Sequence, residues 1–314
     1  MKKVVYCMLL SLLLGACSSW NYVSIETREP AILPLPADVR NIVFIDNSLV
    51  GQRDSSNIIL LNALSQFIRE NQYFDNVDVL AETEGRINGE RLKSIRDSLD
   101  ADAFVLLNSF VMSATKTKSG NHQIHVDSLI AYLQVNMSLF GADGQILSTT
   151  PLSMSDSLLW VEVRSGDDYY LTEPLPSGEE LLKEITIYTA TQLEKYFVPY
   201  WNKRDRQYYT DGTTQMKQAS AFARGSNWEN ALEVWQSLYN ENKNVKKKAR
   251  LALNISLAHE MLDNLEDALA WIAKAEKDYS GVEVDVEESD YVEAYKEELQ
   301  NRIEAFKVLD SREE

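Results

Sequence analysis

The sequence predicts a mixed α/β domain followed by an all-α domain of helical repeats. Three observations predict this class: an N-terminal apolar run that ends at a cysteine, alternating strand-like and helix-like segments up to about residue 210, and a self-similar helical pattern from residue 213. We therefore divide the chain into a signal segment (1–16), a linker (17–38), an α+β or α/β domain with a mixed sheet (39–210), and helical repeats with a C-terminal capping helix (211–314).

The N-terminus has the composition of a secretory signal. Lys2 and Lys3 precede an apolar run over 4–14, and Gly15 and Ala16 lead to Cys17. This end resembles the lipobox of bacterial lipoproteins, which implies cleavage before Cys17 and lipidation of Cys17. An ordinary cleaved signal and a membrane-spanning anchor are the alternatives, but a span needs roughly 20 apolar residues. Residue 18 is not Asp, so the resemblance implies an outer-membrane anchor with the body facing the periplasm.

Composition excludes several classes of function. Loss of Lys2 and Lys3 with the signal takes the formal charge from −17 to −19, which disfavours nucleic acids and anionic lipids as partners. The one dense basic segment, 243–250, lies between two predicted helices and is interpreted as a solvated helix start. The mature chain keeps no free thiol, because Cys7 leaves with the signal and Cys17 is lipidated, so disulfides and cysteine–metal sites are excluded.

The linker and the first domain follow from local patterns. Pro30, Pro34 and Pro36 predict an extended spacer over 21–36, with 22–25 as a candidate edge strand. Strands are predicted over 41–46, 74–80 and 101–107, and helices over 58–68 and 89–99, an order typical of an α/β sandwich. A long strand over 126–140, a turn at 141–144, return strands over 145–150 and 158–163, and a helix from Ser177 to about residue 196 follow. This order of elements resembles the periplasmic α/β domains of curli-secretion and penicillin-binding-protein activator lipoproteins.

Two C-terminal segments repeat one pattern of small and large residues, 37 residues apart. The matching pairs are Ala219 and Ser256, Ala231 and Ala268, and Trp235 and Ile272. The pattern resembles the tetratricopeptide repeat, in which small residues let paired helices approach. A generic helical bundle is the alternative, and a helix over 289–309 is expected to cap the array.

The repeat resemblance also implies a concave groove that binds a peptide or a partner helix. Six residues map to that groove, although each of them also fits a packing or solvated position: Met216, Ser220, Arg250, Leu253, Leu257 and Glu260.

The sequence contains only weak matches to catalytic, metal-binding and modification motifs. The run from Ser113 to Lys116 matches the Ser-x-x-Lys of penicillin-binding enzymes, but we place it in a polar turn, whereas that serine must open a helix. His122 and His125 are three apart, and only His125 shares a strand face with Asp127, so we predict no metal site and no cofactor. Three Asp-Ser-Leu segments resemble O-glycosylation acceptors of Bacteroidota, with Ser98, Ser128 and Ser157 as the candidate residues.

As a whole, the chain resembles an uncharacterised family of Bacteroidota lipoproteins with an α/β domain of unknown function and tetratricopeptide-like repeats. The resemblance implies a protein that is not an enzyme and that binds an envelope protein or peptide, tethered to the membrane through Cys17. The alternative is an accessory glycan-binding lipoprotein of a nutrient-uptake system. Such a protein would expose aromatic platforms, for which the candidates are Trp20, Trp160, Trp201, Trp228, Trp235 and Trp271.

Overall fold

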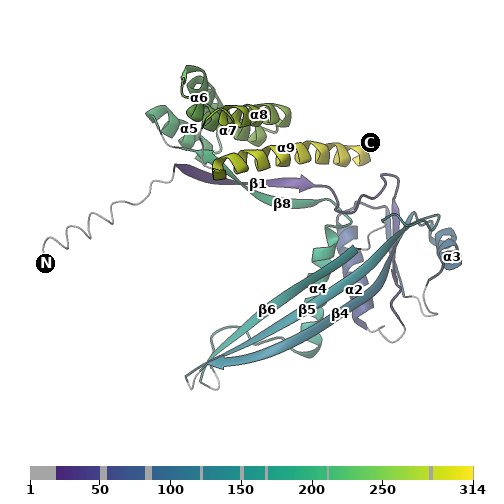
Figure 1. Cartoon of the computed structure of the whole chain (residues 1–314). Coiled ribbons are helices and arrows are strands. Elements are labelled where there is room, and N and C mark those ends of the chain that lie inside the picture. Colours follow the sequence, from purple (N-terminus) through teal and green to yellow (C-terminus); the bar gives the residue numbers. More distant parts are fainter. Residues whose placement is uncertain are drawn as a thin grey trace. The chain divides into compact units, whose positions relative to one another are not determined.

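A computed structural model describes residues 19–49, 55–81, 87–120, 123–148, 152–166, 169–210, 212–282 and 286–313 (Figure 1). The chain forms two compact units. The sheet unit is Pro30–Tyr200, and the helical unit comprises the chain up to Glu29 together with Trp201–Glu314. The predicted fold class, a mixed α/β region followed by a helical region, is confirmed. The signal segment 1–16 and Cys17 lie outside the described residues.

The sheet unit is built on one six-stranded sheet with the order β3-β2-β4-β5-β6-β7. β2 (Asn41–Asp46) runs parallel to β3 (Asn76–Leu80) and to β4 (Ala103–Gly120). β5 (Ile124–Gly141), β6 (Leu152–Ser165) and β7 (Tyr169–Tyr170) continue the sheet in antiparallel pairs. Parallel pairing is therefore confined to the part of the sheet that the helical crossovers connect.

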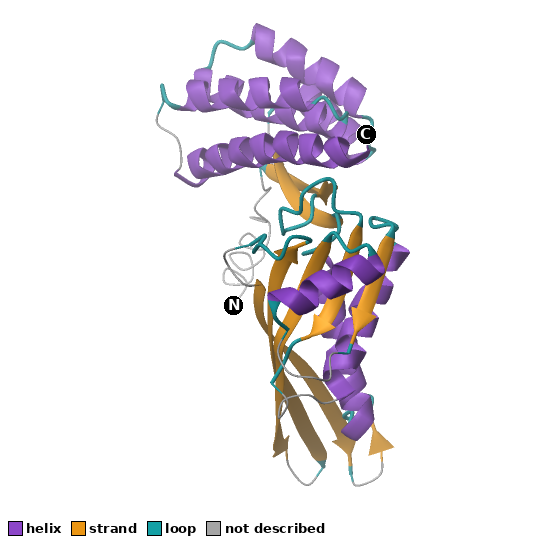
Figure 2. Ribbon diagram, turned by 90° about the vertical axis from the view of Figure 1, so that its right-hand side faces the viewer, coloured by secondary structure: helices purple, strands orange, loops and turns teal. Residues whose placement is uncertain are grey.

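Helices cover the two faces of this sheet unequally. α2 (Ser55–Glu70) and α4 (Gly178–Glu194) pack on one face, where Ile42, Phe44 and Val105 meet Leu64. α3 (Gly89–Leu99) packs on the other face against Val43, Ile45, Phe104 and Leu106. Figure 2 shows the long strands of the sheet extending well beyond the short helix. α2 and α4 thus cover more of the sheet than α3 does, since α3 lies only near the parallel strands.

Most boundaries in the sheet unit agree with the sequence expectations, because local signals set them. Asn88 caps α3 by accepting a hydrogen bond from the Arg91 backbone N–H (2.9 Å), and α3 ends where Asp100 takes a left-handed conformation (φ 51°). β4 is much longer than the predicted strand over 101–107. Its second half carries Ser, Thr and Lys, which resemble a loop in sequence, but pairing with β5 through to Gly120 keeps it extended.

The helical unit contains two helix pairs and a long last helix. The pairs are α5 (Thr214–Arg224) with α6 (Trp228–Glu241), and α7 (Val245–Met261) with α8 (Leu265–Tyr279). Trp235 and Ile272 lie at the centre of the core, and Ala231 and Ala268 have no exposed surface. The predicted capping helix is α9 (Val286–Glu313). The spacing of small and large residues thus identified which helix faces pack together.

A two-stranded ribbon completes the helical unit. β1 (Trp20–Glu29) pairs with β8 (Tyr200–Tyr209). The strands are antiparallel, since the Thr210 N–H donates to the Ser19 carbonyl (2.8 Å) at one end and Thr27 Oγ1 donates to the Asn202 carbonyl (3.3 Å) at the other. The candidate edge strand 22–25 within the predicted linker 17–38 is part of this longer strand. The compact units divide at residues 200–201, ten residues before the end of the predicted domain 39–210, because β8 pairs with β1.

Candidate functional site

The residues expected to line an open groove lie inside the helical unit. Met216, Ser220, Leu253, Leu257 and Glu260 are buried, and Arg250 is half-buried. We therefore correct the expectation of an accessible groove at these six positions. The physical reason is that segments of the same unit, β8 and α9, occupy the face of α7 that carries Glu260.

Asn254 fastens β8 to α7. Its side-chain amide donates to the Tyr209 carbonyl (2.7 Å), and its side-chain oxygen accepts from the Tyr209 backbone N–H (2.7 Å). Asn254 has no exposed surface, so both hydrogen bonds are shielded from water. A strand of the chain itself thus takes the place beside α7 where the repeat resemblance implied a bound peptide.

Glu260 is the centre of a buried ion cluster that joins three elements. Its Oε2 accepts from Arg206 Nε of β8 (2.8 Å) and from the Tyr295 hydroxyl of α9 (2.6 Å). Its Oε1 accepts from Arg206 Nη2 (3.0 Å) and from Arg302 Nη1 of α9 (3.0 Å). Burial alone would raise the pKa of Glu260, but the hydrogen bonds and charge of Arg206, with help from Tyr295 and Arg302, hold that pKa below its usual range. The cluster is structural, because its four donors all point into the interior.

Arg250 belongs to a second cluster at the N-terminal end of α7. Its Nε donates to Glu288 of α9 (3.0 Å), and its guanidinium lies over the rings of Tyr209 (4.5 Å) and Trp20 (5.6 Å). The Tyr279 hydroxyl donates to the same Glu288 carboxylate (3.0 Å), and burial, followed by the Glu288 charge, raises the pKa of Tyr279. Arg250 therefore anchors the ribbon to the helices and is not available as a partner-binding cation.

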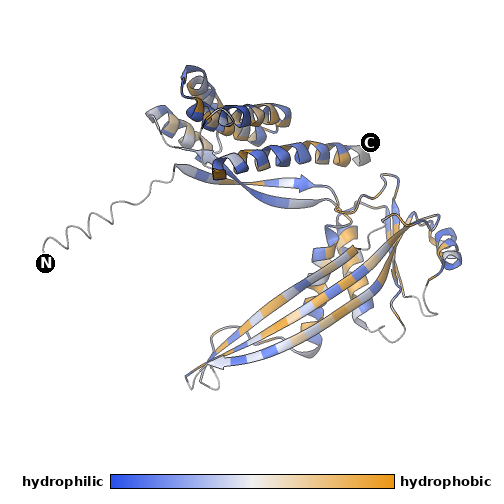
Figure 3. Cartoon of the chain, in the orientation of Figure 1, coloured by the Kyte–Doolittle hydropathy of each residue, from blue (hydrophilic) through white to orange (hydrophobic). Residues whose placement is uncertain are grey.

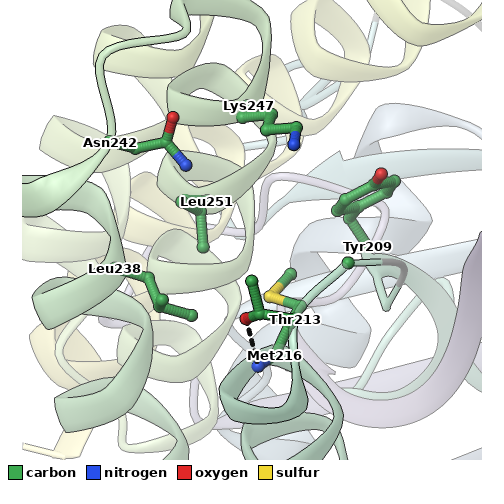
Figure 4. Close-up of a pocket in the computed structure, with 8 residues that line it drawn as sticks. Tyr209, Thr213, Met216, Leu238, Asn242, Lys247 and Leu251 are labelled. Carbon is green, nitrogen blue, oxygen red and sulfur yellow. Dashed lines mark hydrogen bonds between the residues drawn. The ribbon is translucent and has the colours of Figure 1, made fainter.

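One small cavity opens beside this cluster (Figure 4). Its volume is about 60 Å³, and its walls come from β8, the end of α6 and the starts of α5 and α7. The labelled side chains that line it are Tyr209, Thr213, Met216, Leu238, Asn242, Lys247 and Leu251. Binding pockets for small molecules usually measure roughly 300–1,000 Å³, so this cavity is too small for a metabolite.

The sheet unit presents a different surface, which we call the open sheet face: Val111, Ile130, Tyr132, Leu159 and Val161. Alternation along β5 sends Leu129, Ala131 and Leu133 into the core beneath α2 and α4, and sends Ile130 and Tyr132 to the opposite side.

On that opposite side, α3 packs only over β2 and the adjoining ends of β4 and β5, near Phe104 and Phe140. Beyond α3, Tyr132 is 53% exposed and Leu159 is 63% exposed. Their strands lie side by side in Figure 1, and Figure 3 shows hydrophobic positions distributed along them.

Cross-strand register gathers these side chains. Ile130 lies directly opposite Leu159, and Tyr132 lies opposite Ser157 on one side and Ser113 on the other. Directly paired side chains on one sheet face are roughly 4.5–5.5 Å apart at Cβ. The sequence carries a signal for this surface, because the apolar runs at 129–133 and 158–161 do not alternate, which indicates strands that are apolar on both faces.

The candidate glycosylation serines divide between two places. Ser98 is exposed on α3 and its hydroxyl donates to the Ser94 carbonyl (2.6 Å). Ser128 and Ser157 lie on the open sheet face, opposite Val161 and Tyr132 respectively. Glycosylation of Ser128 or Ser157 stays a prediction, and it would cover the apolar side chains next to them.

The other residues considered for chemistry do not form a site. Ser113 and Lys116 lie on β4 and not in a turn, which corrects that expectation. Asp127 forms ion pairs with Lys116 (3.2 Å) and Arg164 (3.7 Å), while His122 lies outside the described residues. In the described ranges, no group of three or more His, Cys, Asp or Glu side chains is placed to hold a metal ion.

The tryptophans do not gather into a platform. Trp228 and Trp235 are buried in the helical core, and Trp160 donates from Nε1 to Glu184 (2.8 Å). Trp201 is 68% exposed on the outer side of β8. It lies near the Arg28 end of the ribbon, far along β1 from the exposed Tyr22.

Comparison with protein families finds matches over most of this chain. Residues 39–209 match the domain of unknown function DUF8603. The chain belongs to the DUF8603 family. Residues 217–301 match a second domain of unknown function, DUF6340, which covers most of the helical unit. The DUF8603 match includes the sheet unit from residue 39 and also β8.

A comparison of this DUF8603 family member with curated proteins finds no match. Among solved structures, a PelC dodecamer from Paraburkholderia phytofirmans is 12% identical over 57% of this chain and 99% of its own, with a TM-score of 0.26. A neuraminyllactose-binding hemagglutinin homolog from Helicobacter pylori is 12% identical over 55% and 89%, with a TM-score of 0.31. Lipoprotein GNA1162 from Neisseria meningitidis is 13% identical over 49% and 97%, with a TM-score of 0.22. Likenesses this low transfer no function.

Across the described parts of the chain, no helix is both long and apolar enough to cross a bilayer.

Proposed function

We propose that this protein is a lipid-anchored component of the bacterial cell envelope that binds a protein partner through the open sheet face and catalyses no reaction. The anchor is Cys17, and the body faces the periplasm from the outer membrane, as the lipobox and residue 18 imply. The tetratricopeptide-like helical unit acts as a scaffold beside that anchor.

The observation that carries this proposal is the exposure of adjacent apolar side chains on a rigid sheet. Ile130 and Leu159 face each other across β5 and β6, and Tyr132 and Val161 flank them. Contiguous exposed apolar patches mark interaction sites in soluble domains. Ser113, Thr115 and Thr117 border the patch on β4 and offer hydroxyl groups to a partner's polar rim. The helical groove is the weaker candidate, because β8 and α9 already occupy it.

A photo-crosslinking experiment tests the proposal. A photoreactive amino acid is placed at position 132 or 159 in cells, with the exposed Lys217 of α5 as the control position. We expect positions 132 and 159, and not 217, to yield an adduct with the same envelope protein. A Leu159→Glu variant should lose the adduct formed from position 132, whereas Lys93→Glu on α3 should keep it.

Two results would contradict the proposal. Equal adducts from all three positions would show that the sheet face has no special affinity. An adduct with polysaccharide, or hexose mass on Ser128 or Ser157 in the native protein, would favour the glycan-binding alternative or a glycosylated face in place of a protein-binding one.

A further inference from the structure

The helical unit carries a group of lysines at the end where the lipid-anchored chain enters it. We call this group the lysine corner: Lys243, Lys246, Lys247 and Lys248, at the junction of α6 and α7. We propose that the lysine corner binds the anionic phospholipid surface of the membrane that holds the anchor. The orientation that this implies rests on the lipid anchor proposed above; the lipid affinity of the lysines does not.

The covalent distance to the anchor is short. β1 begins at Trp20, and the Ser19 carbonyl already accepts a hydrogen bond from the Thr210 N–H (2.8 Å). Three residues of fully extended chain span roughly 11 Å at most, so a lipid on Cys17 holds Trp20 within that distance of the attachment point. The expected spacer of about 20 residues is replaced by a strand fixed to the helices. The end of the helical unit around Trp20 must therefore lie at the bilayer surface.

Ring and cation contacts connect that end to the start of α7. The rings of Trp20 and Tyr209 meet edge to face, with centroids 5.3 Å apart, and Arg250 of α7 lies over both rings. Lys247, one turn earlier on α7, lines the small cavity together with Tyr209, and Figure 4 shows the two side chains on its rim. The lysine corner is therefore next to the point at which the tether arrives.

The lysines are not neutralised by ion pairs. Lys243 and Lys247 are exposed, Lys246 and Lys248 are half-buried, and within the described residues none of the four forms a salt bridge. Lys248 Nζ lies over the Tyr239 ring at 4.3 Å, a contact that leaves its positive charge in place.

One neighbouring acid, Glu288, is neutralised by Arg250. Asp278 and Glu241 accept hydrogen bonds from the neutral hydroxyls of Tyr239 (3.3 Å) and Ser237 (3.1 Å) and keep their negative charges. The corner carries four positive charges within six residues against these two acids, and the segment 243–250 contains no acidic residue.

Local charge decides the interaction in spite of the net charge of −19 on the mature chain, −17 less Lys2 and Lys3. Charges separated by more than about 10 Å are largely screened at 0.1 M salt. The acidic residues elsewhere therefore oppose binding weakly, while each lysine near an anionic surface attracts it. The repulsion expected from composition applies to the chain as a whole and is reversed at this corner.

Vesicle sedimentation tests the proposal without any need for the anchor. The full mature chain with Cys17→Ser is mixed either with vesicles of phosphatidylcholine that contain about 30% phosphatidylglycerol or with vesicles of phosphatidylcholine alone. We expect binding only to the anionic vesicles, loss of binding at high salt, and a partition coefficient roughly 1,000-fold lower when the four lysines are replaced by Gln. The control variant replaces four other exposed lysines, Lys93, Lys118, Lys183 and Lys203, and should bind like the parent.

Equal loss in both variants would show that net charge alone governs binding, and an absence of binding to anionic vesicles would overturn the proposal outright. Acylation of Cys17 is assayed separately by mass spectrometry of the protein from membranes, so failure of the anchor and failure of the lysine corner are distinguishable. If the anchor is present, amine labelling of the lipidated protein in anionic vesicles should spare Lys243 and Lys247 and modify Lys93.

Discussion

Replacement of Glu260 by Gln should destabilise the helical unit far more than its small chemical change suggests. Each carboxylate oxygen of Glu260 accepts two hydrogen bonds, from Arg206 and Tyr295 at Oε2 and from Arg206 and Arg302 at Oε1. In either orientation, the Gln amide would turn an NH₂ group toward two donors. Removing one partner of a buried ion pair costs about 3–5 kcal/mol, and we expect the lower part of that range. Arg206 keeps Glu298 and Arg302 keeps Asp263, which limits the loss.

Urea unfolding followed by tryptophan fluorescence measures this change. Trp160 is the only tryptophan of the sheet unit, so a Trp160→Phe background reports on the helical unit alone. With a urea m-value of about 1–3 kcal/mol/M, the midpoint should fall by roughly 1 M or more. The control is Glu276→Gln, which removes a half-exposed pair with Lys296 and should cost less than about 1 kcal/mol. Equal midpoints for the two variants would refute the assignment of the Glu260 cluster as the link between α7, α9 and β8.

Three further predictions concern the interiors of the two units. Asn254→Ala should lower the stability of the helical unit by about 2 kcal/mol or more, because both backbone groups of Tyr209 lose a buried partner; an unchanged urea midpoint would contradict this. Burial lowers the pKa of His259 below 6.5, and the charge of Asp267 only partly offsets this. As the pH falls, His259 is therefore protonated in the unfolded chain before it is protonated in the folded one. Stability should therefore fall as the pH drops below 6.5 through the lowered folded-state pKa, and a His259→Leu variant measured by the same titration should lose that slope. Leu133→Ala should lower the unfolding free energy of the sheet unit by about 2–5 kcal/mol, and Tyr132→Ala on the exposed face should lower it by less than about 1 kcal/mol. Urea unfolding followed by circular dichroism measures both changes, and similar losses would mean that the two sheet faces are assigned wrongly.

The elements that the sequence predicted well are those whose signals are local. β2 is a continuous apolar run, α3 has its own cap at Asn88, and α4 ends before Pro199. Each of these features needs only its neighbours in the chain. The packing of the helix pairs was predictable for the same reason, because Ala231 and Ala268 mark the close approach directly.

The strands that were predicted too short depend on distant partners. β1 has a polar alternating sequence, and its partner β8 lies about 180 residues away in the chain. The second half of β4 is extended only because β5 pairs with it. The repeat pattern assigned Leu253, Leu257 and Glu260 to one face of α7, but it contains no information that Arg206 and Arg302 would cover that face. Burying the Glu260 carboxylate or the Asn254 amide without a hydrogen-bond partner would be unfavourable in free energy. A polar residue at these two helix positions therefore indicates that another segment of the chain supplies partners there.

The pairing of β1 with β8 makes the sheet unit a domain inserted into the helical one. Ile32 and Leu33 donate backbone hydrogen bonds to the carbonyls of Lys195 and Tyr196 (both 3.0 Å), so the two ends of the inserted domain are held together by its own fold. Once that domain has folded, β1 and β8 meet as though a short turn joined them, and the entropic cost of closing a loop of about 170 residues is already met. Folding should therefore be ordered, with the inserted domain first. A short glycine-containing turn in place of 30–200 should leave a helical domain that folds on its own, and the inserted domain can vary or be exchanged without altering how the anchor is held.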